Sequence, residues 1–100
     1  MRKTAGKNLP PGWTEGTVQE LLGLTDAEAA IVEMRLRMAE RVRQCRAARR
    51  LTQKQLAERL RSKQPHIARL EQGDASLELM MRALLVMGES TKKIARVLAA

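Results

Sequence analysis

Residues 51–73, LTQKQLAERLRSKQPHIARLEQG, restrict the possible fold more than any other part of the chain. Thr52 is a good N-cap residue, and Leu56 and Leu60 lie four residues apart, on one face of a helix. Pro65 lacks a backbone N–H and is tolerated only in the first turn of a helix, so a second helix must begin near it. The segment therefore predicts two short helices joined by a tight turn.

The same segment also predicts the turn and the residue at which the second helix begins. The first helix is expected to end by Arg61, which leaves Ser62 and Lys63 to turn the corner. Gln64 precedes a proline and is therefore pushed towards the extended conformation that suits an N-cap. If Ile67 faces inward, one exposed surface carries Gln64, Pro65, His66 and Arg69.

This exposed surface has the chemistry needed to read a DNA major groove, which admits one helix. Arg69 can donate twice to guanine, Gln64 can pair with adenine, and His66 can donate to a base or a phosphate. Pro65 offers rigidity, or an apolar contact to a thymine methyl group.

The rest of the chain also favours helices. Hydrophobic residues make up 44% of the sequence, yet Trp13 is the single aromatic residue, so Leu, Ile, Val, Met and Ala must fill the core. Such a core suits helices better than strands, and one hundred residues can bury one modest core. The expected fold class is all-α.

Capping residues and periodicity predict where the other helices lie. A short helix over residues 17–22 is expected to end at Gly23, and Thr25 with Glu28 forms a capping box that opens a long helix running towards Arg50. The apolar stripe of the long helix consists of Ile31, Met34, Met38, Val42 and Cys45. Two later helices are expected after the N-caps Ser76 and Ser90, with inward-facing residues Leu77, Met80, Leu84, Met87, Ile94, Val97 and Leu98.

Positive charge is concentrated in the middle of the chain, whose net charge is +8. Residues 35–63 contain eleven basic and two acidic side chains, whereas residues 1–34 contain three and five, and residues 64–100 contain five and four. Solvated helix faces usually mix both signs, so this distribution indicates a surface that binds a polyanion.

Several other classes of protein are disfavoured. With one Cys and one His, the chain can assemble neither an internal disulfide nor a metal or nucleophilic site, and no cofactor is expected. One His, two Asp, no Tyr and no Gly-rich phosphate loop also argue against an enzyme. RNA-binding modules usually have stacking aromatic residues, which are missing. No run is long enough to span a membrane and no secretory signal is present, so a cytoplasmic protein is expected.

The segments LTQKQLAERL and QPHIARLEQG resemble the helix-turn-helix of the phage repressor and Cro (XRE) family, over about residues 38–98. The resemblance implies a compact five-helix, repressor-like domain that binds operator DNA as a homodimer. It also implies that Gln53 contacts a phosphate and that bases are read by Gln64, Pro65, His66 and Arg69. Arg46 and Glu71 would form a structural ion pair. Together with the charge pattern, it predicts phosphate contacts from Gln53, Lys54, Arg61, Ser62, Lys63 and Arg50.

The chain departs from the family at two turns. Many relatives have glycine where this sequence has Arg50 and Arg61. If these positions require a positive φ, each arginine costs on the order of 1 kcal/mol.

Three parts of the chain are expected: a flexible segment (1–13), a helical extension (14–37) and the helix-turn-helix domain (38–100). The extension resembles that of HigA-like antitoxins, which bind a RelE-type toxin and repress their own operon. Two functions therefore remain open, a transcriptional regulator (a repressor is favoured) and an autoregulating antitoxin of a RelE/HigB-like toxin. Trp13 is expected to pack on the first short helix rather than to anchor a toxin.

Overall fold

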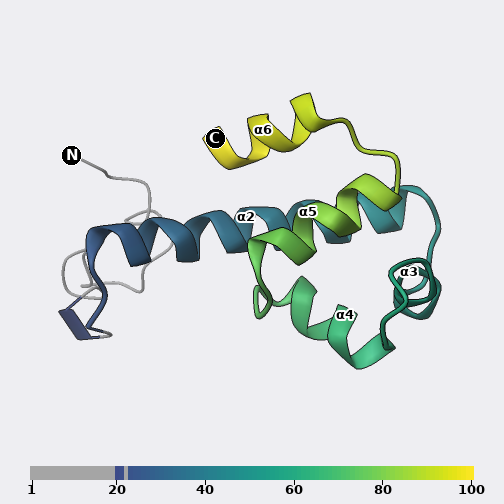
Figure 1. Ribbon diagram of the computed structural model, residues 1–100, viewed down its shortest axis with the longest axis horizontal. Helices are drawn as coiled ribbons and strands as arrows, with labels where there is room; N and C mark the ends of the chain where they lie inside the picture. The colour runs from purple at the N-terminus through teal and green to yellow at the C-terminus, as the bar shows by residue number, and fades with distance from the viewer. Residues whose placement is uncertain (1–19, 22) are drawn as a thin grey trace. The chain divides into compact units, whose positions relative to one another are not determined.

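The computed structural model describes residues 20, 21 and 23–100 (Figure 1). Its helices are α2 (Asp26–Ala48), α3 (Gln53–Arg59), α4 (Gln64–Glu71), α5 (Leu77–Val86) and α6 (Thr91–Ala99). No strand occurs among the described residues, and the predicted all-α class is confirmed. The chain divides into two units, residues 1–33 and 34–100. Trp13 and most of the helix expected over 17–22 lie outside the described residues, although Glu20 and Leu21 are helical.

Helix α2 begins with the predicted capping box. The Glu28 N–H donates to Thr25 Oγ1 at 3.1 Å, and the Thr25 N–H donates to Glu28 Oε1 at 2.9 Å. The bond from the Thr25 backbone is the main reason that the pKa of Glu28 lies below its ordinary value. The carboxylate therefore stays ionised at neutral pH and continues to accept this bond.

The apolar stripe of α2 is covered over only part of its predicted length. Met38, Val42 and Cys45 are buried and Met34 is half-buried, but Ile31 is 38% exposed. The apolar stripe therefore extends beyond the buried core, and Ile31 lies in its exposed part. Helical periodicity shows which side of a helix is apolar, but not how far along that side other residues cover it.

The core of residues 34–100 is one cluster to which all five helices contribute. Its fully buried side chains include Met38, Leu56, Ile67, Leu70, Met80 and Leu84. Cys45 is the small core residue that the sequence predicts, and its Sγ accepts a hydrogen bond from Arg49 Nη1 at 2.8 Å. On α6, Ile94 is buried, whereas Val97 and Leu98 are half-buried.

Each of the helices α2 to α5 is followed, two residues after its last residue, by a residue with left-handed backbone. The positive φ angles belong to Arg50 (55°), Arg61 (54°), Gly73 (88°) and Gly88 (93°). At the end of α2, the Leu51 N–H donates to the Arg46 carbonyl at 3.0 Å, and the other three helices repeat this pattern of a Schellman motif. Both arginines thus occupy conformations that favour glycine.

Helix α4 begins one residue earlier than predicted. Its N-cap is Lys63, with extended backbone (φ −116°, ψ 151°), and Gln64 is its first helical residue. Pro65 therefore takes the second position, where its missing N–H still costs nothing. The steric bias against a helical residue before proline is a preference, and here the helix overrides it.

Candidate nucleic-acid interface

Helices α3 and α4 pack against each other across a short turn (Figure 1). Thr52 caps α3 as predicted: its Oγ1 accepts from the Gln55 N–H at 3.0 Å, and the Gln55 side chain accepts from the Thr52 N–H at 2.8 Å. The letters TQKQ follow the capping-box pattern, so this reciprocal bond was readable from the sequence. At the turn, Ser62 Oγ and His66 Nδ1 are 2.9 Å apart, which links the turn to the first turn of α4.

The four predicted base-reading residues are all exposed. Gln64, Pro65 and His66 occupy the first turn of α4, and Arg69 lies one turn further on the same helix. Ile67 and Leu70, on the opposite side, are fully buried. Helix α4 therefore presents a polar face whose orientation is set by its apolar residues.

Arg69 has a partner within the protein, but a weak one. Its Nε lies 3.4 Å from Asp74 Oδ2, and the two side chains are 67% and 72% exposed. Exposed ion pairs of this kind contribute little because solvent screens them. Arg69 can therefore exchange Asp74 for another acceptor at small cost.

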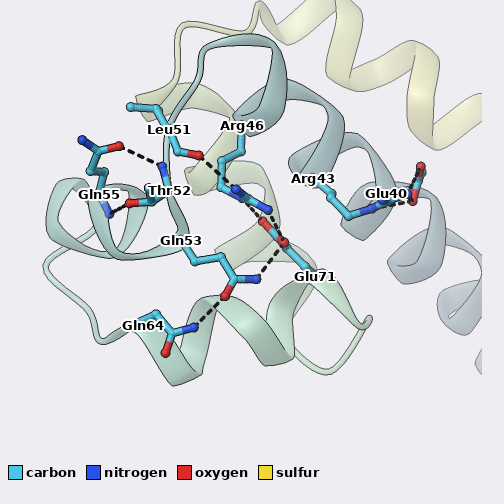
Figure 2. Close-up of polar contacts among 9 residues, drawn as sticks. All are labelled: Glu40, Arg43, Arg46, Leu51, Thr52, Gln53, Gln55, Gln64 and Glu71. Atoms are coloured by element: carbon cyan, nitrogen blue, oxygen red, sulfur yellow. Dashed lines mark hydrogen bonds and ion pairs between the residues drawn. The ribbon is translucent and has the colours of Figure 1, made fainter.

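A chain of polar contacts runs from α2 through α4 to the start of α3 (Figure 2). The ion pair predicted between Arg46 and Glu71 is present: Nε lies 2.6 Å from Oε2 and Nη2 lies 3.0 Å from Oε1. Arg46 Nη1 also donates to the Leu51 carbonyl at 2.9 Å. The hydrogen bond to Glu71 raises the pKa of the Arg46 guanidinium, which keeps this arginine charged.

Gln53 extends this chain to the exposed start of α4. Its Nε2 donates to Glu71 Oε1 at 3.0 Å, and its Oε1 accepts from Gln64 Nε2 at 2.6 Å. The Glu71 side chain is 5% exposed, whereas Gln64 is exposed. The buried Glu71 carboxylate thus positions the Gln53 side chain, and Gln53 in turn holds the amide nitrogen of Gln64. The Oε1 of Gln64 can still accept a hydrogen bond from another donor. Sequence reasoning missed this contact because residues 53, 64 and 71 are far apart along the chain.

The predicted phosphate-contacting residues differ in how far their hydrogen-bonding groups and charges are already used within the protein. Gln53 uses its carbonyl and one N–H within the protein and keeps a second N–H. Ser62 is half-buried and bonded to His66. The cations at positions 50, 54, 61 and 63 are exposed, and none has an ion-pair partner within the part of the chain that the structure describes. Unpaired positive charge therefore precedes α4 in the sequence, and two of these cations, Arg61 and Lys63, lie in the turn directly before its first residue.

Within residues 20, 21 and 23–100 no three His, Cys, Asp or Glu side chains are grouped as a metal would require. Among the same residues, no helix is both long and apolar enough to cross a lipid bilayer.

The two packed helices, the turn between them and the exposed polar start of the second define a DNA-binding helix-turn-helix protein. A family model described as a helix-turn-helix domain matches residues 37–89, more than half of the chain, and the chain belongs to this family. Members of the family bind DNA and are typically not enzymes. No curated protein and no solved structure is significantly similar to the chain.

Proposed function

We propose that the protein is a sequence-specific transcriptional regulator, and a repressor in particular, that reads the DNA major groove with the start of α4. The observation that carries this proposal is the exposed row of Gln64, Pro65, His66 and Arg69 on a helix held by a buried ion pair. A rigidly held helix start keeps its hydrogen-bonding groups in register with base edges. Under this proposal the protein binds its DNA target in the cytoplasm.

Each exposed side chain has a proposed role. Arg69 donates to guanine, and Gln64, whose amide nitrogen is held by Gln53, offers its oxygen to a base donor. His66 is tied to Ser62 and donates from its other ring nitrogen. Pro65 stiffens the helix start and has no donor to contribute. Arg50, Lys54, Arg61 and Lys63, with Gln53 and Ser62, hold phosphates.

The first test is selection of random duplex DNA on the purified protein at about 0.15 M salt, where non-specific phosphate attraction is partly screened. An enriched palindrome would support an operator-binding dimer. If no sequence is enriched, the proposed base readout is wrong.

Arg69→Ala and Lys54→Ala should affect binding to the selected DNA differently. Arg69→Ala removes a base contact, so it should relax the preference at one base position by about 1–3 kcal/mol. Lys54→Ala removes a phosphate contact and should weaken selected and unrelated duplexes alike. Competition binding with a set of singly altered operators measures both effects. An unchanged base preference in Arg69→Ala would mean that another residue reads that position.

The same proposal includes a homodimer, because one recognition helix reads only a few base pairs. Leu85 and Val86, at the end of α5, are 48% and 39% exposed, and these apolar side chains support a self-association surface there. Leu85→Glu should therefore yield a folded monomer in sedimentation experiments, whereas Glu78→Lys, on the same helix, should leave the oligomeric state unchanged. Equal mass for wild type and Leu85→Glu would place the interface elsewhere.

An antitoxin remains the second candidate. Leu21, Ile31 and Val32, all ahead of the helix-turn-helix, are exposed apolar residues (69%, 38% and 39%) and support a protein-binding surface in the extension over residues 14–37. This candidate requires a RelE/HigB-like toxin encoded by a neighbouring gene. Co-expression of the two proteins should give a stable complex that Ile31→Asp disrupts while DNA binding is retained. Absence of a complex would exclude that neighbour as the partner.

A further inference from the structure

The centre of the exposed face of α4 is apolar, with polar residues on either side. At about 100° per residue, Pro65 lies about 160° around the helix from Ile67 and about 140° from Leu70, the buried residues of α4. By this spacing no other α4 residue points as directly away from both, and Pro65 is exposed. Ala68, half-buried and one turn further along, extends the apolar surface. The face that α4 offers to a groove therefore has an apolar middle.

The two polar side chains next to Pro65 are tied to other parts of the protein. Gln64 Nε2 donates to Gln53 Oε1 on α3 at 2.6 Å (Figure 2), and His66 Nδ1 lies 2.9 Å from Ser62 Oγ. These bonds direct the two side chains towards α3 and the preceding turn, and the ring of Pro65 is exposed between them. When the start of α4 enters a major groove, this ring meets the base edges.

A proline ring discriminates among the base edges of the major groove. The ring has neither a donor nor an acceptor, so a polar base edge beneath it loses water without gaining a hydrogen bond. The C5 methyl group of thymine is the apolar group that the standard bases present in this groove. 5-Methylcytosine carries a methyl group at the same ring position. Both pyrimidines therefore suit the surface that Pro65 presents.

Arg69 brings a second base contact close to this ring. Pro65 and Arg69 are four residues apart on α4, so their Cβ atoms lie roughly 5–6 Å from each other. Consecutive bases of one strand are about 3.4 Å apart along the axis of the duplex. The two side chains therefore reach base pairs that are about one or two steps apart. Guanine is the base that offers two acceptors to an arginine.

We infer that Pro65 reads the C5 methyl group of a pyrimidine, either thymine or 5-methylcytosine, close to the guanine that Arg69 reads. This contact rests on the proposed function, because it requires α4 to enter the major groove. It makes Pro65 a specificity-determining residue and a methylated pyrimidine a part of the operator. Burial of one methyl group corresponds to about a fourfold change in affinity.

The experiment starts from operators that the full-length protein enriches from two random duplex libraries, one ordinary and one in which every cytosine is 5-methylcytosine. In the ordinary operator, deoxyuridine replaces the thymine closest to the guanine identified with Arg69→Ala. In the methylated operator, cytosine replaces the closest 5-methylcytosine. Each exchange removes one methyl group and keeps the hydrogen-bonding groups of the base pair. We expect at least one exchange to weaken binding about fourfold. The exchange that does so identifies thymine or 5-methylcytosine as the source of the methyl group.

Three variants test whether Pro65 makes the contact, with the ratio of affinities for the methylated and demethylated duplexes as the readout. Pro65→Ser replaces the ring with a small polar side chain and should bring the ratio to within about twofold of one. Pro65→Ala keeps an apolar side chain without the fixed φ of proline, and should retain part of the preference. Lys54→Ala removes a phosphate contact, so it should weaken both duplexes alike and leave the ratio at the wild-type value. A less stable helix start also lowers both affinities together.

Two results overturn the inference while the proposed function stands. In one, operators are enriched but neither methyl exchange weakens binding. In the other, Pro65→Ser keeps the full wild-type preference, which would mean that another residue reads the methyl group. If neither library yields an enriched sequence, the proposed base readout fails and the methyl contact fails with it.

Discussion

Arg50 and Arg61 each combine a strained backbone with an exposed charge. Both have positive φ, where an L-residue other than glycine pays on the order of 1 kcal/mol. At the equivalent positions after α4 and α5 the chain has glycine, Gly73 and Gly88. If these exposed arginines contact DNA phosphates as proposed, their attraction for phosphate offers a reason for the less stable residue.

Arg61→Gly should raise the free energy of unfolding by up to about 1 kcal/mol, because relief of strain outweighs the greater entropy of the unfolded chain. The same variant should bind all DNA duplexes more weakly. Arg59→Gly, two residues earlier and within α3, should instead lower stability by roughly 0.5–1 kcal/mol. Urea unfolding measures both. The same sign for the two variants would contradict the assignment of strain to Arg61.

Among the helices, α3 depends most on its cap. It has seven residues, too few to be stable in isolation, and both orphan N–H groups of its capping box are satisfied by Thr52 and Gln55. Caps of this kind made most helix starts readable in advance, as Thr25, Ser76 and Ser90 also show. The start of α4 was misplaced by one residue because its N-cap, Lys63, makes no side-chain bond to the helix.

Thr52→Ala should lower the free energy of unfolding by about 1 kcal/mol, since the Gln55 N–H loses its acceptor. Thr91→Ala is the matched control: Thr91 is the first residue of α6, whose cap is Ser90, so its loss should change stability by less than about 0.5 kcal/mol. Chemical denaturation and the loss of helical circular dichroism report the difference. Equal effects would show that the capping bond adds no stability.

For the whole domain, the ion pair of Arg46 and Glu71 ties three helices together. Glu71 accepts from Arg46 on α2 and from Gln53 on α3, and itself ends α4. Its side chain is 5% exposed and that of Arg46 is 19% exposed. Loss of one partner in such a buried pair leaves a charge unsatisfied, whereas an exposed pair loses little.

Glu71→Gln should therefore destabilise the domain by roughly 2–3 kcal/mol, a little below the range for a fully buried pair because Arg46 keeps some contact with water. If Gln64 reads a base as proposed, Glu71→Gln should also loosen the base preference at that position, because Gln53, which holds Gln64, loses its bond to the carboxylate. Glu40→Gln removes an exposed ion pair with Arg43, which solvent screens, and should leave the stability of the domain nearly unchanged. A thermal unfolding series tests the contrast, and equal shifts for the two variants would refute it.

The sequence by itself determined the helices, most of their caps, the exposed row on α4 and the concentration of charge, because each depends on residues within a few positions of one another or on composition. The tertiary structure decided that Gln53 bridges Glu71 and Gln64, and that Arg37 on α2 donates to the Leu98 carbonyl on α6. These features join residues 11 to more than 50 positions apart, as Gln53 joins Gln64 and Arg37 joins Leu98. Periodicity and capping carry no information over such separations, since only the packing of complete helices brings these side chains together.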